Sequence, residues 1–194
     1  MAVEFEIKFR ATPEQQTALR SVLAGEEREY TMRTTYYDTP SGDLSARKYT
    51  LRRRMENEKS VCTLKTPAEG LGRNEFELNC AAIEEAIPEL CRLSGLPELP
   101  GLLAKGVVPF CGAAFQRTAI TLERPDCVLE IALDRGVLTG GGREQPLCEI
   151  EVELKSGDRE GAMAYGKMLQ AAYGLTQEPL SKVQRARALA RGEL

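Results

Sequence analysis

The chain has 194 residues, of which 42% are hydrophobic and 28% charged, a composition typical of a globular protein with one domain or two halves that share a core. It contains no run of about 18 apolar residues, which excludes a membrane-spanning helix. The net charge of −3 argues against a general nucleic-acid binder. The complete absence of histidine excludes triads, general bases and zinc sites that depend on this residue.

The cysteines indicate a reducing environment. They form no C-x-x-C pair, and their spacings match no zinc site. The N-terminus enters a charged segment at once and shows no apolar signal-peptide core. We therefore expect free thiols and a cytoplasmic location. The six cysteines are Cys62, Cys80, Cys91, Cys111, Cys127 and Cys148.

Residues 3–10 alternate strictly between apolar and charged side chains, which predicts a β-strand with one fully charged face. The charged face of this strand carries Glu4, Glu6, Lys8 and Arg10.

A helix is expected after this strand. Thr12 can serve as its N-cap, Gln15 completes a capping box, and Gly25 fits just past its end.

Four further strands are predicted in the first half of the chain. Residues 29–38 are rich in threonine and tyrosine, which favour strands. Residues 49–55 and 60–66 are expected to form a hairpin, and residues 73–78 alternate after a turn. The last three of these strands each carry a charged face. Its charged residues are Arg52, Arg54, Lys65, Arg73, Glu75 and Glu77, whereas Arg53 has the opposite parity and should point outward.

Residues 81–105 interrupt this pattern. A short helix is expected over 81–87 and should stop at Pro88, and residues 96–101 read as a connector. Neither half looks self-sufficient, so we expect a hinge within one domain that covers residues 1–194.

The second half resumes the alternation. Strands are predicted over 110–123, 127–134 and 147–155, a helix over 158–173, and a last helix capped by Ser181. The charged faces of these three strands carry Arg117, Glu123, Glu130, Asp134, Glu149, Glu151 and Glu153.

About eight strands with one apolar and one charged face allow two arrangements. The charged faces could meet solvent, as in many α+β proteins. Alternatively, the sheet could close into a barrel with a charged lumen and helices packed on its apolar outer face. The second arrangement is favoured because neutral polar residues are scarce on these faces, and because acids and bases share them.

A charged lumen needs compensation, because removing an ion from water costs several kcal/mol. The glutamates could have raised pKa values, pair with the basic side chains, or hold a cation. The arginines and lysines on these faces would be compensated by a bound polyanion. A metal-chelated polyphosphate satisfies both demands, and an all-oxygen carboxylate site suits Mg²⁺ or Mn²⁺.

The segment Glu4-x-Glu6-x-Lys8 resembles the hallmark of the CYTH, or triphosphate tunnel metalloenzyme, superfamily. Further expected motifs follow in order and span nearly the whole chain. They are Tyr36-Tyr37-Asp38-Thr39, Leu51-Arg52-Arg53-Arg54, Thr63-Leu64-Lys65, Arg73-Asn74-Glu75, Phe115-Gln116-Arg117, the 129–134 run, the 148–154 run and Leu180-Ser181-Lys182.

The resemblance implies an α+β fold built on an eight-stranded antiparallel barrel, or tunnel, with a charged lumen and helices outside. It implies catalytic roles for Lys8, Glu4 and Glu6. The implied substrate-binding residues are Lys8, Arg52, Arg54, Lys65, Arg73, Arg117 and Lys182. The implied metal ligands are Glu4, Glu6, Asp134, Glu149 and Glu151, with Glu75, Glu130 and Glu153 as further lining residues.

Within the superfamily, the runs from Cys148 to Asp158 and from Leu129 to Asp134 are most similar to bacterial inorganic triphosphatases. Many of these carry a histidine-rich helical phosphate-binding (CHAD) domain, which we do not expect in a chain that ends at Leu194. The implied reaction is hydrolysis of inorganic triphosphate to pyrophosphate and phosphate with Mg²⁺ or Mn²⁺. The expected partner is a small-molecule triphosphate, without nucleic acid or membrane, and a homodimer is left open.

Three alternatives remain at this point. The same tunnel could cyclise ATP as in class IV adenylyl cyclases, although the histidine-containing segment associated with those enzymes is absent. It could hydrolyse thiamine triphosphate or a nucleoside triphosphate. It could also bind polyphosphate or a nucleotide without turnover.

Overall fold

The computed structural model describes residues 2–68 and 72–194, with the side chains described from Phe5 onward. These residues form one antiparallel sheet with the strand order β1-β6-β5-β4-β3-β7-β8-β9-β2-β10. The strands are β1 (Ala2–Glu4), β2 (Glu6–Arg10), β3 (Glu26–Asp38), β4 (Thr50–Glu56), β5 (Lys59–Pro67), β6 (Arg73–Asn79), β7 (Val108–Glu123), β8 (Cys127–Gly140), β9 (Arg143–Gly157) and β10 (Thr176–Gln177).

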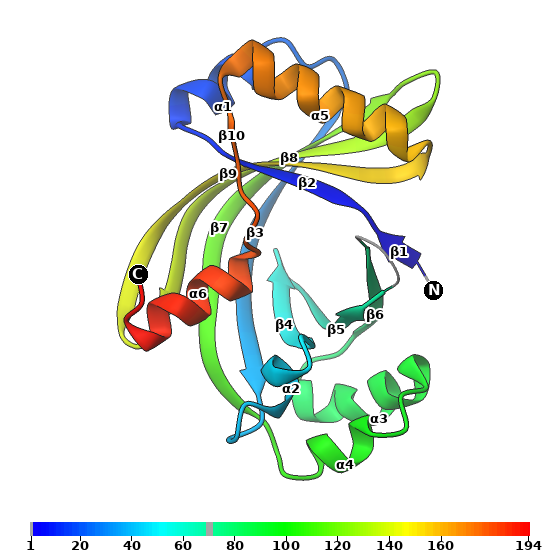
Figure 1. Cartoon of the computed structure of the whole chain (residues 1–194), viewed down its shortest axis with the longest axis vertical. Helices are drawn as coiled ribbons and strands as arrows, with labels where there is room; N and C mark the ends of the chain where they lie inside the picture. The colour runs from blue at the N-terminus through cyan, green and yellow to red at the C-terminus, as the bar shows by residue number, and fades with distance from the viewer. Residues whose placement is uncertain (1, 69–71) are drawn as a thin grey trace.

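The helices are α1 (Pro13–Arg20), α2 (Asp43–Ala46), α3 (Ile83–Ser94), α4 (Leu99–Leu103), α5 (Arg159–Tyr173) and α6 (Lys182–Arg191). The sheet is strongly curved. Helices α1 and α5 lie at one end of the molecule, α3 and α4 lie at the other, and α6 lies beside β7 (Figure 1). Among the described residues, no helix is long and apolar enough to cross a membrane.

The N-terminal segment links the two sides of the sheet. Strand β1 pairs with β6, where Glu4 lies opposite Arg73, whereas β2 pairs with β9, where Ile7 lies opposite Val152. Only Phe5 separates the two strands. The hydrogen-bonded order is nevertheless open and has ten strands instead of the eight expected. The α+β class is therefore confirmed, while closure into a barrel stays a prediction.

The apolar face of the sheet is covered by helices, as the alternating pattern predicts. Leu19 of α1 and Leu169 of α5 share a buried cluster with Ile150 and Val152 of β9. A second cluster joins α3 and α4 to the outer faces of β4, β5 and β6 through residues such as Leu90. The charged residues of these strands consequently lie on the concave face.

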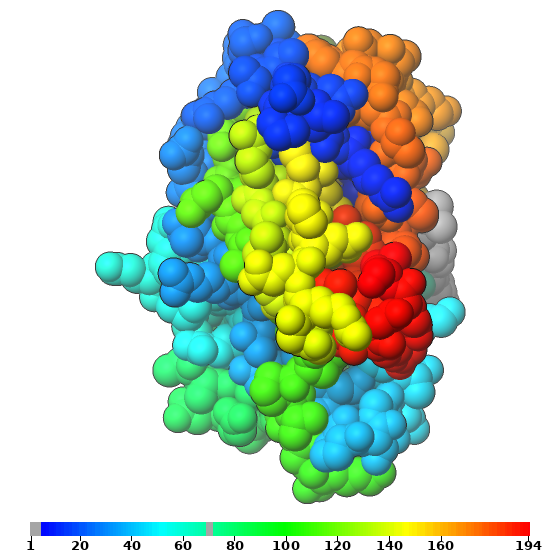
Figure 2. Space-filling model, turned by 90° about the vertical axis from the view of Figure 1, so that its left-hand side faces the viewer, coloured from blue at the N-terminus to red at the C-terminus, as the bar shows by residue number. Residues whose placement is uncertain are grey.

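Helix α6 packs on the concave face itself. Val183 and Leu189 lie in a cluster with Phe115 of β7 and Leu138 of β8. A β-carbon at Gly140 would lie 2.5 Å from the carbonyl oxygen of Ala186 in α6, so glycine permits this close approach. Figure 2 shows the C-terminal helix in red against the yellow turn between β8 and β9.

The predictions for residues 81–101 were wrong in part. Helix α3 runs through Pro88 to Ser94, and α4 begins at Leu99, inside the expected connector. Proline removes one helix hydrogen bond. Ile83 and Leu90, which are buried on either side of Pro88, offset this cost through their contacts with the sheet.

The other helix signals were largely correct. Thr12 and Ser181 each form a complete capping box, and Asp158 caps α5. Helix α1 ends at Arg20, before the expected Gly25. Strands β3, β8 and β9 are longer than predicted. All six cysteines are free thiols.

Candidate functional site

A cavity of about 430 Å³ lies on the concave face of the sheet. Its lining is dominated by charged side chains from strands on both sides of the fold and from the start of α6. These are Glu6, Lys8, Arg52, Arg54, Glu56, Lys65, Arg73, Glu75, Glu77, Arg117, Glu130, Glu151, Glu153, Lys155 and Lys182. Arg53 is not part of the lining, as its parity predicts, and its Nε donates to Ser60 Oγ.

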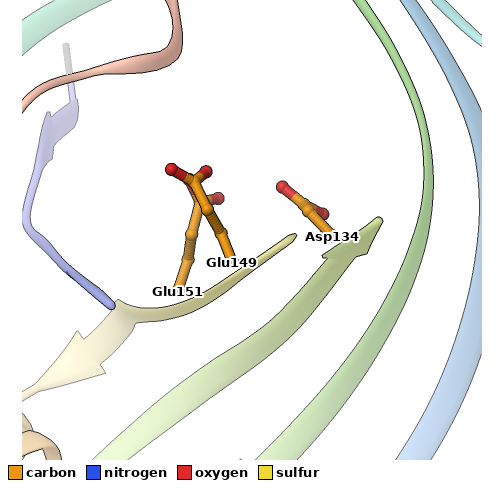
Figure 3. A group of neighbouring side chains, drawn as sticks. All are labelled: Asp134, Glu149 and Glu151. Carbon is orange, nitrogen blue, oxygen red and sulfur yellow. The ribbon is translucent and has the colours of Figure 1, made fainter. Parts of the chain in front are cut away.

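Three carboxylates form an acidic trio, namely Asp134, Glu149 and Glu151. Asp134 on β8 lies opposite Glu149 on β9, and Glu151 is two residues further along the same face. One oxygen atom from each lies within 4.8 Å of the others. Figure 3 shows the three side chains converging from the two neighbouring strands. Asp134 and Glu149 are completely buried.

Lys182 on the first turn of α6 neutralises part of this charge. Its Nζ lies 2.8 Å from Asp134 Oδ2, 2.7 Å from Glu149 Oε2 and 2.6 Å from Glu151 Oε1. Arg117 on β7 makes a bidentate contact with Asp134, with two N···O distances of 2.7 Å, and also binds Glu151. Pairing with basic side chains, one of the ways in which buried glutamates could persist, is therefore observed for this trio.

Arg185 is a third cation beside the trio, and its guanidinium donates to Glu149. One turn of helix separates Arg185 from Lys182, so both side chains leave the same face of α6. Its other side faces Glu178, whose carboxylate accepts from Arg10 Nε at 2.6 Å. This chain of contacts ties the trio to β2 and to the segment before α6.

The pKa values reflect this balance of burial and pairing. Burial would raise the pKa of Glu151, but Lys182 and Arg117 outweigh it and hold the pKa well below its usual range. Burial raises the pKa of Glu149, and Glu151 adds to the effect against Lys182 and Arg185. Burial would lower the pKa of Lys182, but the trio holds it above its ordinary value.

The donor set of the trio fits a hard divalent cation, which prefers carboxylate oxygens. Glu149 Oε2 lies 2.7 Å from Lys182 Nζ. It is nevertheless buried without a well-aligned hydrogen bond, so it retains the capacity to act as a ligand. The residues that could hold such an ion are Asp134, Glu149 and Glu151.

Glu6 of the N-terminal segment is not part of this trio. Glu6 lines the cavity, and its Oε1 accepts from Lys8 Nζ at 3.0 Å. Lys8 lies opposite Glu151 in the β2–β9 ladder. The Glu4 side chain is outside the described residues.

The opposite wall of the cavity is basic and carries Arg52, Arg54, Lys65 and Arg73 on β4, β5 and β6. Glu75 lies 3.3 Å from both Arg52 and Lys65. The Nε atoms of Arg52 and Arg54 are buried without a hydrogen bond. Burial, with the nearby charges of Arg52 and Arg117, lowers the pKa of Arg54 to about 10. The clustered positive charges of this wall favour the binding of an anion.

The structure thus gathers the predicted basic residues and Glu6 around one cavity, and it joins Asp134 and Glu149 to Glu151 at its acidic side. Glu75, Glu130 and Glu153 are also part of the lining. Lys182 and Arg117 were expected to bind phosphate, but both contact the carboxylates.

Sequence reasoning missed two residues of the site. The spacing of Arg185 from Lys182 on one helix is a signal that could have identified it. Glu178 directly follows the two-residue strand β10, so no alternation marks it.

Comparison with known proteins assigns the chain to a family. The CYTH domain family model matches residues 2–186, and the chain belongs to this family. It is 30% identical over 191 residues to an inorganic triphosphatase from Haemophilus influenzae, covering 95% of the present chain and 54% of the relative. The chain therefore spans about half the length of that relative.

Two solved structures share the fold. A candidate adenylyl cyclase from Hippeastrum, in which triphosphatase activity is dominant, is 18% identical with a TM-score of 0.68, over 100% of this chain and 96% of that one. A candidate adenylate cyclase from Bacillus halodurans is 19% identical with a TM-score of 0.64, over 94% and 96% of the two chains.

Proposed function

We propose that this protein hydrolyses inorganic triphosphate to pyrophosphate and phosphate, with Mg²⁺ or Mn²⁺ as cofactor. The proposal rests on one observation, a cavity lined by arginine and lysine on one side and by Glu151 on the other, with Asp134 and Glu149 of the same acidic trio buried directly behind Glu151. A metal-chelated polyphosphate has the matching distribution of charge. The resemblance to an inorganic triphosphatase supports the same class of reaction.

In this proposal the N-terminal segment closes the curved sheet into a tunnel around the phosphate chain. Its pairing with β6 at one end and β9 at the other supports closure, because the two strands flank the cavity from opposite edges. Glu6 and Lys8 bring the segment's charged face into the lining.

The basic wall holds the substrate. The Arg52 and Arg54 guanidinium groups bind phosphoryl oxygens through their planar donors, while Lys65 contributes a point charge. Arg73 extends the wall along β6. Because the protein performs little covalent chemistry in phosphoryl transfer, orientation and charge stabilisation supply most of the rate enhancement.

Asp134, Glu149 and Glu151 hold the metal in this proposal, with Glu4 and Glu6 as further acidic groups. The bound ion would polarise the terminal phosphoryl group and lower the pKa of the attacking water. Lys8, hydrogen-bonded to Glu6, orients the water or stabilises the transferred charge.

The test is product release from tripolyphosphate, thiamine triphosphate and ATP in parallel, each with Mg²⁺, with Mn²⁺ and with chelator. Metal-dependent phosphate release that is highest from tripolyphosphate supports the proposal. A cyclic nucleotide with pyrophosphate from ATP would identify a cyclase instead. Calorimetric binding without turnover of any substrate would identify a binding protein.

A matched pair of variants assigns the activity to this site. Glu151→Gln should reduce metal-dependent turnover by at least 100-fold, because the amide is a weak metal ligand and the charge is lost. Glu123→Gln, at the exposed end of β7, should retain wild-type turnover. Equal activity in both folded variants would contradict the assignment.

A further inference from the structure

Lys182 occupies a distinctive position for a residue expected to bind substrate. Its side chain is 8% exposed, and its ammonium lies 2.6–2.8 Å from one oxygen of each carboxylate in the acidic trio. Its Nζ also lies 5.3 Å from the centre of the Phe115 ring. The ammonium therefore makes the contacts that a cation in the trio would make.

A metal ion and this ammonium cannot share the position. Mg²⁺ binds oxygen at about 2.1 Å. An ion held by the same three oxygens of Asp134, Glu149 and Glu151 would lie within bonding distance of the point that Nζ occupies. Metal binding at the trio consequently requires the ammonium to leave.

Lys182 is also the cation that can leave most easily. Arg117 is held by its bidentate pair with Asp134, and Arg185 is shared between Glu149 and Glu178. Lys182 has a flexible four-carbon stem and a single-point charge. It starts from the first turn of α6, and both Ser181 and Val183 beside it line the cavity.

We propose that Lys182 is a built-in counter-ion that holds the metal position of the trio and exchanges with the divalent cation, which frees its ammonium to contact the anionic substrate in the cavity. This inference rests on the proposed metal site and deepens it. The exchange couples the binding of the metal ion to the binding of the substrate. Metal at the trio makes Lys182 available to the phosphate chain, and a phosphate chain that binds Lys182 favours metal binding in return.

The test is direct Mn²⁺ binding, measured from the electron paramagnetic resonance of the free ion, without tripolyphosphate. Lys182→Met should bind Mn²⁺ with a Kd at least tenfold lower than the wild type, because the competing cation is gone. Lys105→Met is the matched control, since Lys105 is exposed and pairs with Asp43 away from the cavity. It should bind Mn²⁺ as the wild type does.

The outcomes separate the two proposals. Equal Kd values in wild type and Lys182→Met would overturn the counter-ion role while leaving the metal site intact. Failure of every protein to bind Mn²⁺ would overturn both. If Lys182→Met is unfolded in chelator, circular dichroism should show refolding in Mn²⁺ but not in K⁺ of equal ionic strength, and failure to refold would overturn the inference.

The wild type supplies a second measurement. Pulse acetylation, quantified by peptide mass spectrometry, should modify Lys182 several-fold faster in Mg²⁺ than in chelator. The rate at Lys105 should not change. An unchanged rate at Lys182 in saturating Mg²⁺ would contradict the exchange.

Discussion

The two walls of the cavity differ in how they are neutralised. On the acidic wall, Lys182 and Arg117 contact the trio at 2.5–2.8 Å. On the basic wall, the ion pairs of Arg52, Lys65 and Arg54 are longer, at 3.3–3.7 Å. The carboxylates of the acidic wall are paired internally, whereas the buried Nε atoms of Arg52 and Arg54 on the basic wall lack a hydrogen bond that an incoming anion can supply.

This difference indicates how one cavity can bind opposite charges. A wall that is already paired must exchange a partner before it accepts a ligand, and that exchange weakens binding. Guanidinium groups with unsatisfied donors, such as those of Arg52 and Arg54, gain favourable interactions at once. We therefore expect the anion to dominate initial recognition and the cation to follow, and three substitutions test the contrast.

The largest effect is expected on the acidic wall. Asp134→Asn leaves Arg117 and Lys182 with less compensation in a buried site, which typically costs roughly 3–5 kcal/mol of unfolding free energy. Urea denaturation followed by circular dichroism measures this loss. As a control, Asp43→Asn, which removes the carboxylate opposite exposed Lys105, should change stability far less. Similar losses in the two variants would show that the acidic wall is not the more tightly paired one.

The basic wall should respond in the opposite manner. Arg54→Gln removes a buried cation whose pKa is lowered to about 10, so stability should stay unchanged or rise. Affinity for tripolyphosphate, measured by calorimetry, should fall by roughly 10- to 100-fold, the equivalent of one charged hydrogen bond. Arg53→Gln, one residue away on the other face, should bind as the wild type does. A marked stability loss in Arg54→Gln would contradict the contrast.

The smallest effect is expected at Glu178, which contacts Arg185 behind the acidic trio. Glu178 is buried beside Arg10 and Arg185, and burial opposes but does not overcome their lowering of its pKa. Because the pKa of Glu178 is lower in the folded state, its ionised carboxylate stabilises the protein at pH values above the unfolded-state pKa of 4.5. This stabilisation is lost as the pH falls through the folded-state pKa. Glu178→Gln should cost roughly 1–3 kcal/mol at neutral pH.

The pH dependence of this variant supplies the check. Thermal unfolding from pH 7 to pH 3 should show that the wild type and Glu178→Gln converge as the medium becomes acidic. A stability difference that stays constant over this range would show that the charge of Glu178 is not responsible.

Alternation along the strands predicted most of the charged residues that line the cavity. Glu149 and Glu151 lie on one face of β9, and Ile150 and Val152 pack on the other, because side chains alternate along a strand. Alternation does not determine register. The proximity of Asp134 to Glu149 depends on the turn between β8 and β9, which sets the pairing of the two strands.

Other features depend on tertiary contacts that no local pattern reveals. Pro88 was predicted to stop a helix, but burial of the apolar face of α3 outweighs the missing hydrogen bond. The contacts of Lys182 with the trio follow from the packing of α6 against Gly140, because this packing brings the first turn of α6 to the trio. Contacts between segments so distant in sequence cannot be derived from propensity.

Strands β1 and β2 pair with different parts of the sheet, β6 and β9, and this arrangement also affects the order in which the protein can fold during synthesis. Ile7 must wait for Val152, so strand β2 remains without its partner β9 until the chain between them has been synthesised. At about 5–20 residues per second, this delay is on the order of ten seconds. Such non-local strand pairing is a slow step in folding. During synthesis β2 is therefore an amphipathic strand with exposed edges, so this strand is where a chaperone would be of most use.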